Sequence, residues 1–224
     1  MTDWSRIQGI ANRPNGPVPN PLNLAFGSTV PIGDGVVGAV LMDTGVTLTS
    51  VTDDKGNGYT IFAPHDDGIL SFAAFRSNGF LTNSPKTLTY TTSGGATLST
   101  FWQVQDDFQP PTGATLFSVD GSSVTFNSGG TSFTNFSTTS PDDLAYAAAF
   151  SSGTSTHGAS FNQGSGDGTQ VCSEWGIQAA AGTVTMNLAT QAGSLWGPAF
   201  ALNAGNAGPA FVPFGVLGLA SNEW

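Results

Sequence analysis

Short apolar runs, separated by turns rich in Gly, Pro, Asn and Asp, recur along most of the chain. Val36–Met42 is a continuous apolar run with the length of one buried strand. In Thr87–Thr91, Leu88 and Tyr90 alternate with threonines, which is the period of a half-buried strand. The Asn-Gly step at 57–58 lies between apolar runs and favours a tight hairpin. Further strands are predicted at Val46–Val51, Tyr59–Phe62, Ile69–Phe75, Leu98–Val104, Ser122–Phe126, Ser132–Phe136, Thr169–Ala179, Val184–Leu188 and Trp196–Leu202.

The order of these runs repeats, which predicts a duplicated strand-rich unit. Gly35–Val40 is similar to Asp143–Ala148, Thr87–Tyr90 to Thr183–Met186, and Leu98–Val104 to Leu195–Leu202. Because the three correspondences keep their order and nearly their spacing, we expect two stacked sheets with pseudo-symmetric halves. Chance similarity among low-complexity strands is the alternative.

The segment 140–150 is compatible with a helix or a strand. Ser140 and Pro141 form a good helix start, and two aspartates follow. Leu144–Phe150 is alanine-rich and could continue that helix. We expect a strand there, because the segment has a strand as its counterpart in the repeat.

The two ends of the chain differ from the middle. Four prolines fall within 1–29, at 14, 17, 19 and 21, and they enforce extended backbone without ladder donors. We interpret 1–29 as an extended arm that could lie along a neighbouring subunit, or else a floppy terminus. Residues 30–203 form the sandwich domain, and 204–224 is an apolar tail that needs a surface to cover.

Charge and composition exclude several classes of function. Fifteen acids face five scattered bases, for a net charge of −10, so the basic face that nucleic acids require is missing. Anionic membranes are disfavoured for the same reason, and no apolar stretch approaches the roughly 18 residues of a membrane span. Cys172 is the one cysteine, which excludes an intrachain disulfide. The N-terminus lacks the pattern of a signal peptide, so we expect synthesis in the cytoplasm.

The sequence offers few candidates for chemistry. The loop Asp53–Asn57 lacks the ligand spacing of a calcium site and is interpreted as a turn. Glu174 precedes Trp175, as an acid in a sugar cleft would, but no partner acid can be named for it. His65 and His157 lie in turn-rich stretches without a recognisable triad motif. We therefore assign no catalytic, cofactor-binding or metal-binding residue, and we expect no enzyme activity and no cofactor.

Aromatic residues are abundant, with 16 Phe and 5 Trp, and their alternation places most of them in a core. In a second interpretation, some aromatic residues in loops contact partner proteins or glycans. The loop residues concerned are Phe62, Phe80, Phe108, Phe117 and Phe161.

Several segments together resemble a motif of β-sandwich domains in phage virion proteins and bacterial surface proteins. They are Asp34–Val40, Ser50–Thr60 with its S-V-T-D-D-K-G-N-G-Y run, Glu174–Trp175, Ala181–Thr185 and Trp196–Ala201. The resemblance spans about 30–203 and implies an Ig-like or jelly-roll sandwich, with a strand at 144–150. Pro198 stands where the motif has a small residue, and we expect an edge position there.

The resemblance and the composition lead to an expected role as a virion structural protein. Capsid decoration, head-spike or tail-assembly subunit are the forms we expect, with contacts to other virion proteins through 1–29 and 204–224. Homo-oligomers are expected, in a ring or trimer. The alternatives are a carbohydrate-binding adhesin, with a host glycan as ligand, and a polysaccharide-active enzyme around Glu174.

Overall fold

The computed structural model of the chain describes residues 3–115, 117–128, 133–166, 168–190 and 194–205, and regular structure within them is all β. The strands are β1 (Ser5–Asn12), β2 (Val18–Pro19), β3 (Leu22–Ala25), β4 (Gly35–Asp43), β5 (Leu48–Asp53), β6 (Tyr59–Asp66), β7 (Leu70–Ser77), β8 (Thr87–Thr92), β9 (Thr97–Leu98), β10 (Phe101–Gln109), β11 (Ser118–Ser128), β12 (Phe136–Thr138), β13 (Asp143–His157), β14 (Asn162–Gln163), β15 (Thr169–Gln178), β16 (Gly182–Val184), β17 (Leu188–Thr190) and β18 (Leu195–Asn203). The all-β prediction is confirmed. The strand expected at Leu144–Phe150 is confirmed as part of β13.

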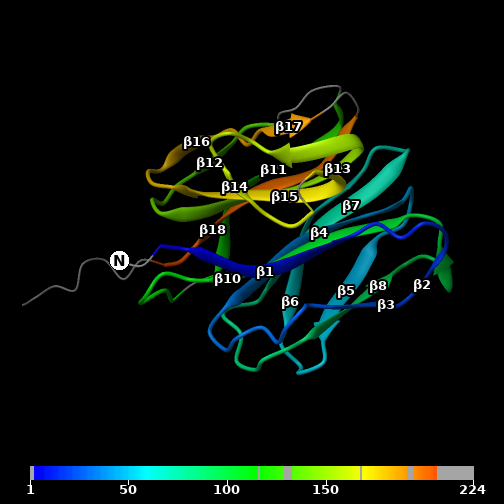
Figure 1. Cartoon of the computed structure of the whole chain (residues 1–224), viewed down its shortest axis with the longest axis horizontal. Coiled ribbons are helices and arrows are strands. Elements are labelled where there is room, and N and C mark those ends of the chain that lie inside the picture. Colours follow the sequence, from blue (N-terminus) through cyan, green and yellow to red (C-terminus); the bar gives the residue numbers. More distant parts are fainter. Residues whose placement is uncertain (1–2, 116, 129–132, 167, 191–193, 206–224) are drawn as a thin grey trace, which may run out of the picture.

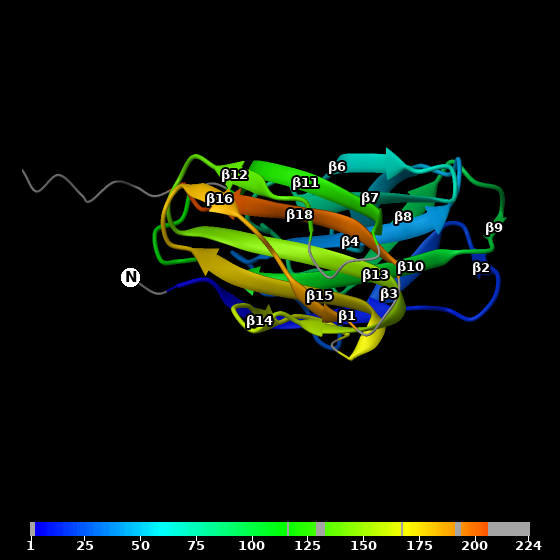
Figure 2. The same ribbon diagram turned by 90° about the horizontal axis from the view of Figure 1, so that it is seen from above.

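The strands form two inner sheets and two smaller outer ones, all antiparallel (Figures 1 and 2). The first inner sheet has the order β1-β10-β4-β7-β6, and the outer sheet β3-β8-β5 belongs to the same half of the chain. The second inner sheet has the order β11-β18-β13-β15-β14, with β12-β16 as its outer pair. Strands β2 and β9 form a separate short ribbon.

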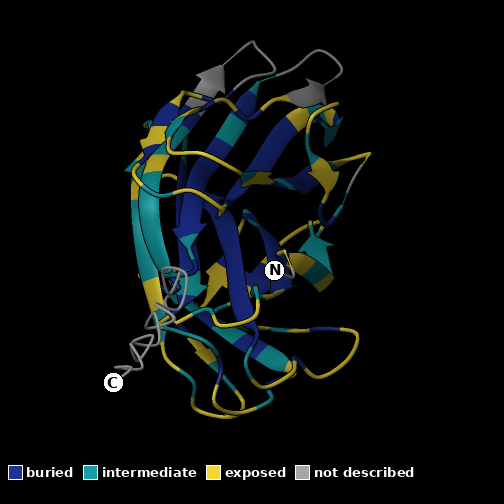
Figure 3. Ribbon diagram, turned by 90° about the vertical axis from the view of Figure 1, so that its left-hand side faces the viewer, coloured by how far each residue is buried: buried dark blue, intermediate teal, exposed yellow. Residues whose placement is uncertain are grey.

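Three hydrophobic cores separate these layers, because side chains alternate between the two faces of each inner strand. On β4, Val37 and Leu41 point into a central core between the inner sheets, whereas Val40 and Met42 point toward the first outer sheet. On β13, even-numbered residues from Leu144 to Phe150 enter the central core, and the alanines between them enter the core of the second half. Figure 3 shows the buried segments concentrated in these inner strands. Each half therefore consists of an inner and an outer sheet around its own core, and the two halves pack together through their inner sheets.

The halves have the same topology, which confirms the duplicated arrangement. Both inner sheets place the equivalent strands in the same order, namely β1 with β11, β10 with β18, β4 with β13, β7 with β15, and β6 with β14. The three sequence correspondences fall on β4/β13, β8/β16 and β10/β18. The last residues of β13, Ser155–His157, pair with β17 as β5 pairs with β8.

The N-terminal segment, interpreted above as an arm, is extended but lies along its own chain. β1 pairs with β10, β2 with β9 and β3 with β8. Ser5–Asn12 contains no proline, so its N–H groups can form the hydrogen bonds of a β-sheet. The prolines lie in the segment between β1 and β3, where the one strand that contains a proline, β2, has two residues. Of the tail 204–224, residues 206–224 lie outside the described residues.

The expectation that Pro198 occupies an edge is wrong. Its strand, β18, lies between β11 and β13, and Pro198 is paired with Val124 on the β11 side. On the β13 side the pairing omits Gly197 and Pro198 and resumes at Trp196. Proline has no N–H to donate, and here it lies where the pairing between β18 and β13 is interrupted, within an interior strand.

Candidate functional site

A buried carboxylate on β10 is the most connected polar group of the interior. Asp106 Oδ1 accepts hydrogen bonds from Arg6 Nε at 2.6 Å and Ser165 Oγ at 2.7 Å. Its Oδ2 accepts from the Tyr146 hydroxyl at 2.7 Å and Ser173 Oγ at 2.6 Å. Since a carboxylate offers about four acceptor positions, these four donors saturate it. The group ties β1 and β10 of one half to β13, β15 and the 165 turn of the other, and it is not available as a nucleophile or base.

The opposite face of β10 is also polar. Gln103 Nε2 donates to the Tyr90 hydroxyl at 3.0 Å and to Gln105 Oε1 at 2.8 Å, and Tyr90 donates in turn to Gln105. All three side chains are buried, and burial raises the pKa of Tyr90. The prediction ended this strand at Val104, before the polar run, whereas β10 continues to Gln109. The polar run QDD directly after an apolar strand was the signal that sequence reasoning missed.

Buried acids form a second group. Burial raises the pKa of Asp107 to about 8, and the charge of Asp34 adds to the shift. Asp143 lies against Asp120, and burial followed by that contact raises its pKa to about 7. Each pair joins segments of one half.

Glu174 is buried on β15 and points into the core of the second half. Burial raises its pKa to about 8, and its Oε2 accepts a hydrogen bond of 2.7 Å from the Gly158 N–H. Trp175, the next residue, points to the other face, where its ring lies 5.5 Å from that of Phe108. The acid and the aromatic that suggested a sugar cleft are therefore on opposite sides of the strand.

The two aspartates that follow His65 accept hydrogen bonds from turns and from the other half of the chain. Asp66 accepts from the N–H groups of Gly68 and Gly45, which lower its pKa to about 2, and also from Ser71 and Thr44. Asp67 accepts from two backbone N–H groups and from the indole of Trp196. His65 packs its ring 5.5 Å from that of Phe72. Both aspartates next to His65 are thus committed to turns and to the contact between halves.

The loop at 53–59 is stabilised by its own side chains, as the interpretation of a turn requires. Asp53 accepts from the Lys55 and Asn57 N–H groups, from the Asn57 amide and from the Tyr59 hydroxyl. Asn57 Oδ1 in turn accepts from the N–H groups of Thr82 and Asn83. Asn57 therefore connects the turn between β5 and β6 to the loop that precedes β8.

The loop aromatics pack inward. Phe108 and Phe117 are buried, and Phe62 is half-buried with its ring 4.9 Å from that of Phe200. Phe80 is half-buried against Phe117, and Phe161 packs on the core of the second half. The core interpretation therefore fits Phe108 and Phe117, whereas Phe62, Phe80 and Phe161 are half-buried and pack on the cores with part of their surface exposed.

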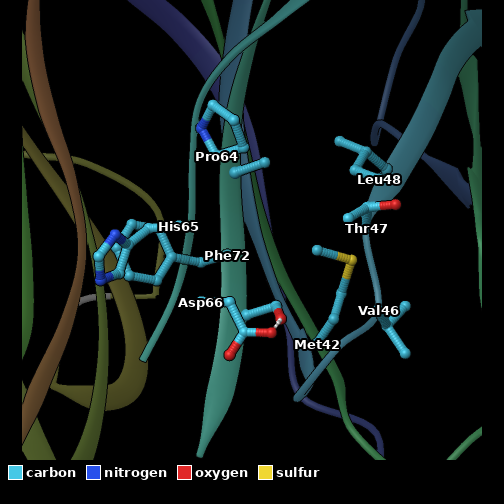
Figure 4. A pocket seen from close by; sticks show the side chains of 10 residues that line it. Met42, Val46, Thr47, Leu48, Pro64, His65, Asp66 and Phe72 are labelled. Atoms are coloured by element: carbon cyan, nitrogen blue, oxygen red, sulfur yellow. Dashed lines mark hydrogen bonds between the residues drawn. The ribbon is translucent and has the colours of Figure 1, made fainter. Parts of the chain in front are cut away.

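Hollows open on the first half at the turn after β4 and at the 56–58 turn. One, of about 180 Å³, lies between the turn after β4 and edge strand β6, and Figure 4 shows Val46 and Leu48 on one side with Pro64 and Asp66 on the other. Its lining is mainly apolar. The second, of about 300 Å³, is lined by the 56–58 turn and the 77–82 loop, with Phe80 beside Asn57 and Asn78.

Within the described ranges, no three His, Cys, Asp or Glu side chains gather closely enough to hold a metal ion. The same part of the chain contains no helix with the length and apolar character needed to cross a membrane. Comparison with known proteins found no family model, no curated protein and no solved structure that matches this chain.

Proposed function

We propose that the protein is a structural subunit of a phage or phage-like virion that works through protein–protein contacts. A capsid decoration, head-spike or tail-assembly component fits this role. The resemblance of the strand pattern to virion sandwich domains is the first support, and the placement of the polar side chains is the second.

The observation that carries the proposal is how the acids and aromatics are used. Asp106 is saturated by donors from both halves, Glu174 is buried against a backbone N–H, and the loop aromatics are packed on cores. On the first half, the hollow beside edge strand β6 is lined mainly by apolar side chains. Strand edges and apolar hollows bind other proteins through backbone pairing and buried side chains.

Cofractionation with particles tests this role. Antiserum against the purified chain is applied to gradient-purified particles from a culture that encodes it, by blotting and by immunogold labelling. The proposal expects the protein in the particle band at a fixed ratio to the other particle proteins. Recovery only among free proteins at the top of the gradient would refute it.

The oligomeric state tests the expected contacts separately. Mass photometry of the full chain is compared with a chain that ends at Gly205, because the apolar residues 206–224 are proposed to contact a neighbour. The proposal expects the full chain to assemble and the shortened chain to lose that assembly. Equal masses would exclude the tail as the contact.

A further inference from the structure

The hollow between the 56–58 turn and the 77–82 loop shares no lining residue with the apolar hollow beside β6. Its volume of about 300 Å³ is close to the lower limit for a small-molecule site. Side-chain amides, hydroxyls and three glycines line it together with Phe80 and Leu81. Small-molecule sites combine apolar walls with a few placed polar groups, and this hollow has both kinds. We call it the amide hollow.

Asn57 holds the two walls of the amide hollow together. Its Oδ1 accepts from the N–H groups of Thr82 and Asn83, each at 3.2 Å. Its Nδ2 donates to Asp53 Oδ2 at 2.7 Å and to the Asn83 carbonyl at 3.2 Å. Because both ends of this side chain are engaged within the protein, Asn57 shapes the hollow. A wall that is formed in advance lowers the entropy cost of binding a ligand.

The Asn78 amide supplies an oriented donor. Asn78 is exposed, its Oδ1 accepts from the Thr60 hydroxyl at 2.5 Å, and its backbone N–H donates to the Gly58 carbonyl at 2.9 Å. Its Nδ2 donates no hydrogen bond to any residue that the structure describes. Gly58 makes room for this nitrogen, since a Cβ at that position would lie 2.5 Å from it. An amide N–H that is fixed in a hollow suits the oxygen of a ligand hydroxyl.

Phe80 supplies an apolar wall. Its ring is half-buried and lies 5.6 Å from the ring of Phe117. The next residue, Leu81, is buried, and its N–H donates to the Asp34 carbonyl at 2.8 Å, which anchors the loop. A ring that is held by a neighbour and remains partly exposed offers a firm apolar surface. The C–H face of a pyranose ring packs on such a surface.

The charges around the amide hollow indicate the class of ligand. Among the described residues, none of the side chains that line the hollow carries a charge. Arg76, which precedes the lining residue Ser77, donates its Nη1 to the Ser77 carbonyl at 2.7 Å. Since the chain carries a net charge of −10, an anion is repelled and meets no cation in the lining. The lining therefore suits a neutral ligand with several hydroxyl groups.

We propose that the amide hollow binds a neutral pyranose unit of a glycan. A sugar hydroxyl accepts a hydrogen bond from Asn78 Nδ2, and the C–H face of the sugar packs on Phe80. This binding activity goes beyond the structural role proposed above and does not depend on it.

Chemical-shift mapping of the isotope-labelled full chain tests the site. The neutral probes are the methyl glycopyranosides of glucose, galactose, mannose and N-acetylglucosamine, and glucuronic acid is the charged comparison. Each is titrated to about 50 mM, because a ligand of this size binds weakly, with a dissociation constant on the order of 1 mM. At least one neutral probe should shift the backbone amide signals of 56–58 and 77–82, and glucuronic acid should shift them less.

Variants of two asparagines separate the site from chance contact. Asn78→Ala should weaken binding about threefold to tenfold, because it removes a neutral hydrogen-bond donor. Asn23→Ala is the matched control, since Asn23 is also exposed and accepts from a threonine hydroxyl, that of Thr89 at 2.7 Å, but lies outside the hollow. It should leave the affinity unchanged. Gly58→Ala displaces the Asn78 amide without removing it and should weaken binding as Asn78→Ala does.

Three results would overturn the proposal. The first is a set of signals at 56–58 and 77–82 that no neutral probe shifts. The second is equal affinity of Asn78→Ala and Asn23→Ala, and the third is tighter binding of glucuronic acid than of every neutral probe. The same spectra show whether each variant is folded, and if Asn78→Ala is not, the comparison of Gly58→Ala with Asn23→Ala decides.

Discussion

The Tyr146 hydroxyl donates a hydrogen bond of 2.7 Å to Asp106 Oδ2, and so links β13 of the second half to β10 of the first. Both groups are buried, and the polar cluster of Asp106 with Arg6, Ser165 and Ser173 lies beside the apolar side chains of the central core. A hydrogen bond to a charged acceptor there has a defined direction, whereas apolar contacts between two flat sheets tolerate sliding. We infer that this bond fixes the register of one half on the other.

Tyr146→Phe should therefore cost about 1.5–3 kcal/mol of unfolding free energy, because it removes a donor from a buried carboxylate. Tyr59→Phe is the matched control, since Tyr59 donates to Asp53 at 3.0 Å in a half-buried turn. We expect a smaller loss there, below about 1.5 kcal/mol. Urea denaturation of both variants gives the comparison, and equal losses would contradict the role of Tyr146.

The fold could be predicted because it rests on local periodicity. Two short-range signals were enough. The alternation of Leu88 and Tyr90 with threonines predicted β8, and the apolar run Val36–Met42 predicted β4. The duplication could also be found, since equivalent strands keep similar apolar residues. The ends of strands were harder, as β10 shows, because Gln105 and Asp106 bind Tyr90 and Ser165, which are distant in sequence.

The candidate site could not be predicted for the same reason. Asp106 meets Ser165, Tyr146 and Ser173 only after the two halves pack, and nothing in the spacing of these residues indicates it. The pairing of the N-terminal segment with its own chain could not be predicted for a different reason. The prolines dominated the composition of 1–29 and obscured the proline-free run that forms β1.

Glu174→Gln should flatten the pH dependence of stability. The pKa of Glu174 rises from 4.5 to about 8 on folding, so the folded state binds the proton more tightly. Its contribution is complete below pH 4.5 and is lost as pH rises toward 8, by roughly 3–5 kcal/mol. A neutral amide can still accept the Gly158 N–H, so the variant should be more stable than wild type at pH 9. Thermal melts from pH 4 to 9 measure this, and parallel curves for the two proteins would contradict it.

The turn at 53–59 should be stable without calcium. Asn57→Ala removes the acceptor for Thr82 and Asn83 and the donor to Asp53, and we expect a loss of about 1–2 kcal/mol. Melting the wild-type chain with calcium chloride and with EDTA should give the same midpoint, because Asp53 is occupied by donors of the chain itself. A higher midpoint with calcium would show that the loop binds the ion.

Gly38→Ala should be strongly unfavourable, although glycine is normally a poor strand residue. A Cβ at Gly38 would lie 2.3 Å from the Val104 carbonyl oxygen and 2.6 Å from the Phe75 ring. The central strand β4 would have to move, at a cost of about 1–3 kcal/mol or more. Gly27→Ala is the control, since no atom lies within 4 Å of its Cβ position. Chemical denaturation should separate the two variants, and equal midpoints would show that β4 can shift without cost.

The two halves should unfold in one transition, because the central core belongs to both. β4, β7 and β10 supply one side of it, and β13, β15 and β18 the other, so either half alone would expose an apolar sheet face. Leu88→Ala, in the core of the first half, and Val184→Ala, in that of the second, lie far from this shared layer. Each should lower the midpoint of the same calorimetric peak, Leu88→Ala by about 2–5 kcal/mol in free energy and Val184→Ala by less. A second peak that stays in place in Leu88→Ala and moves only in Val184→Ala would mean that the halves are independent, and that the Tyr146–Asp106 bond does not couple them.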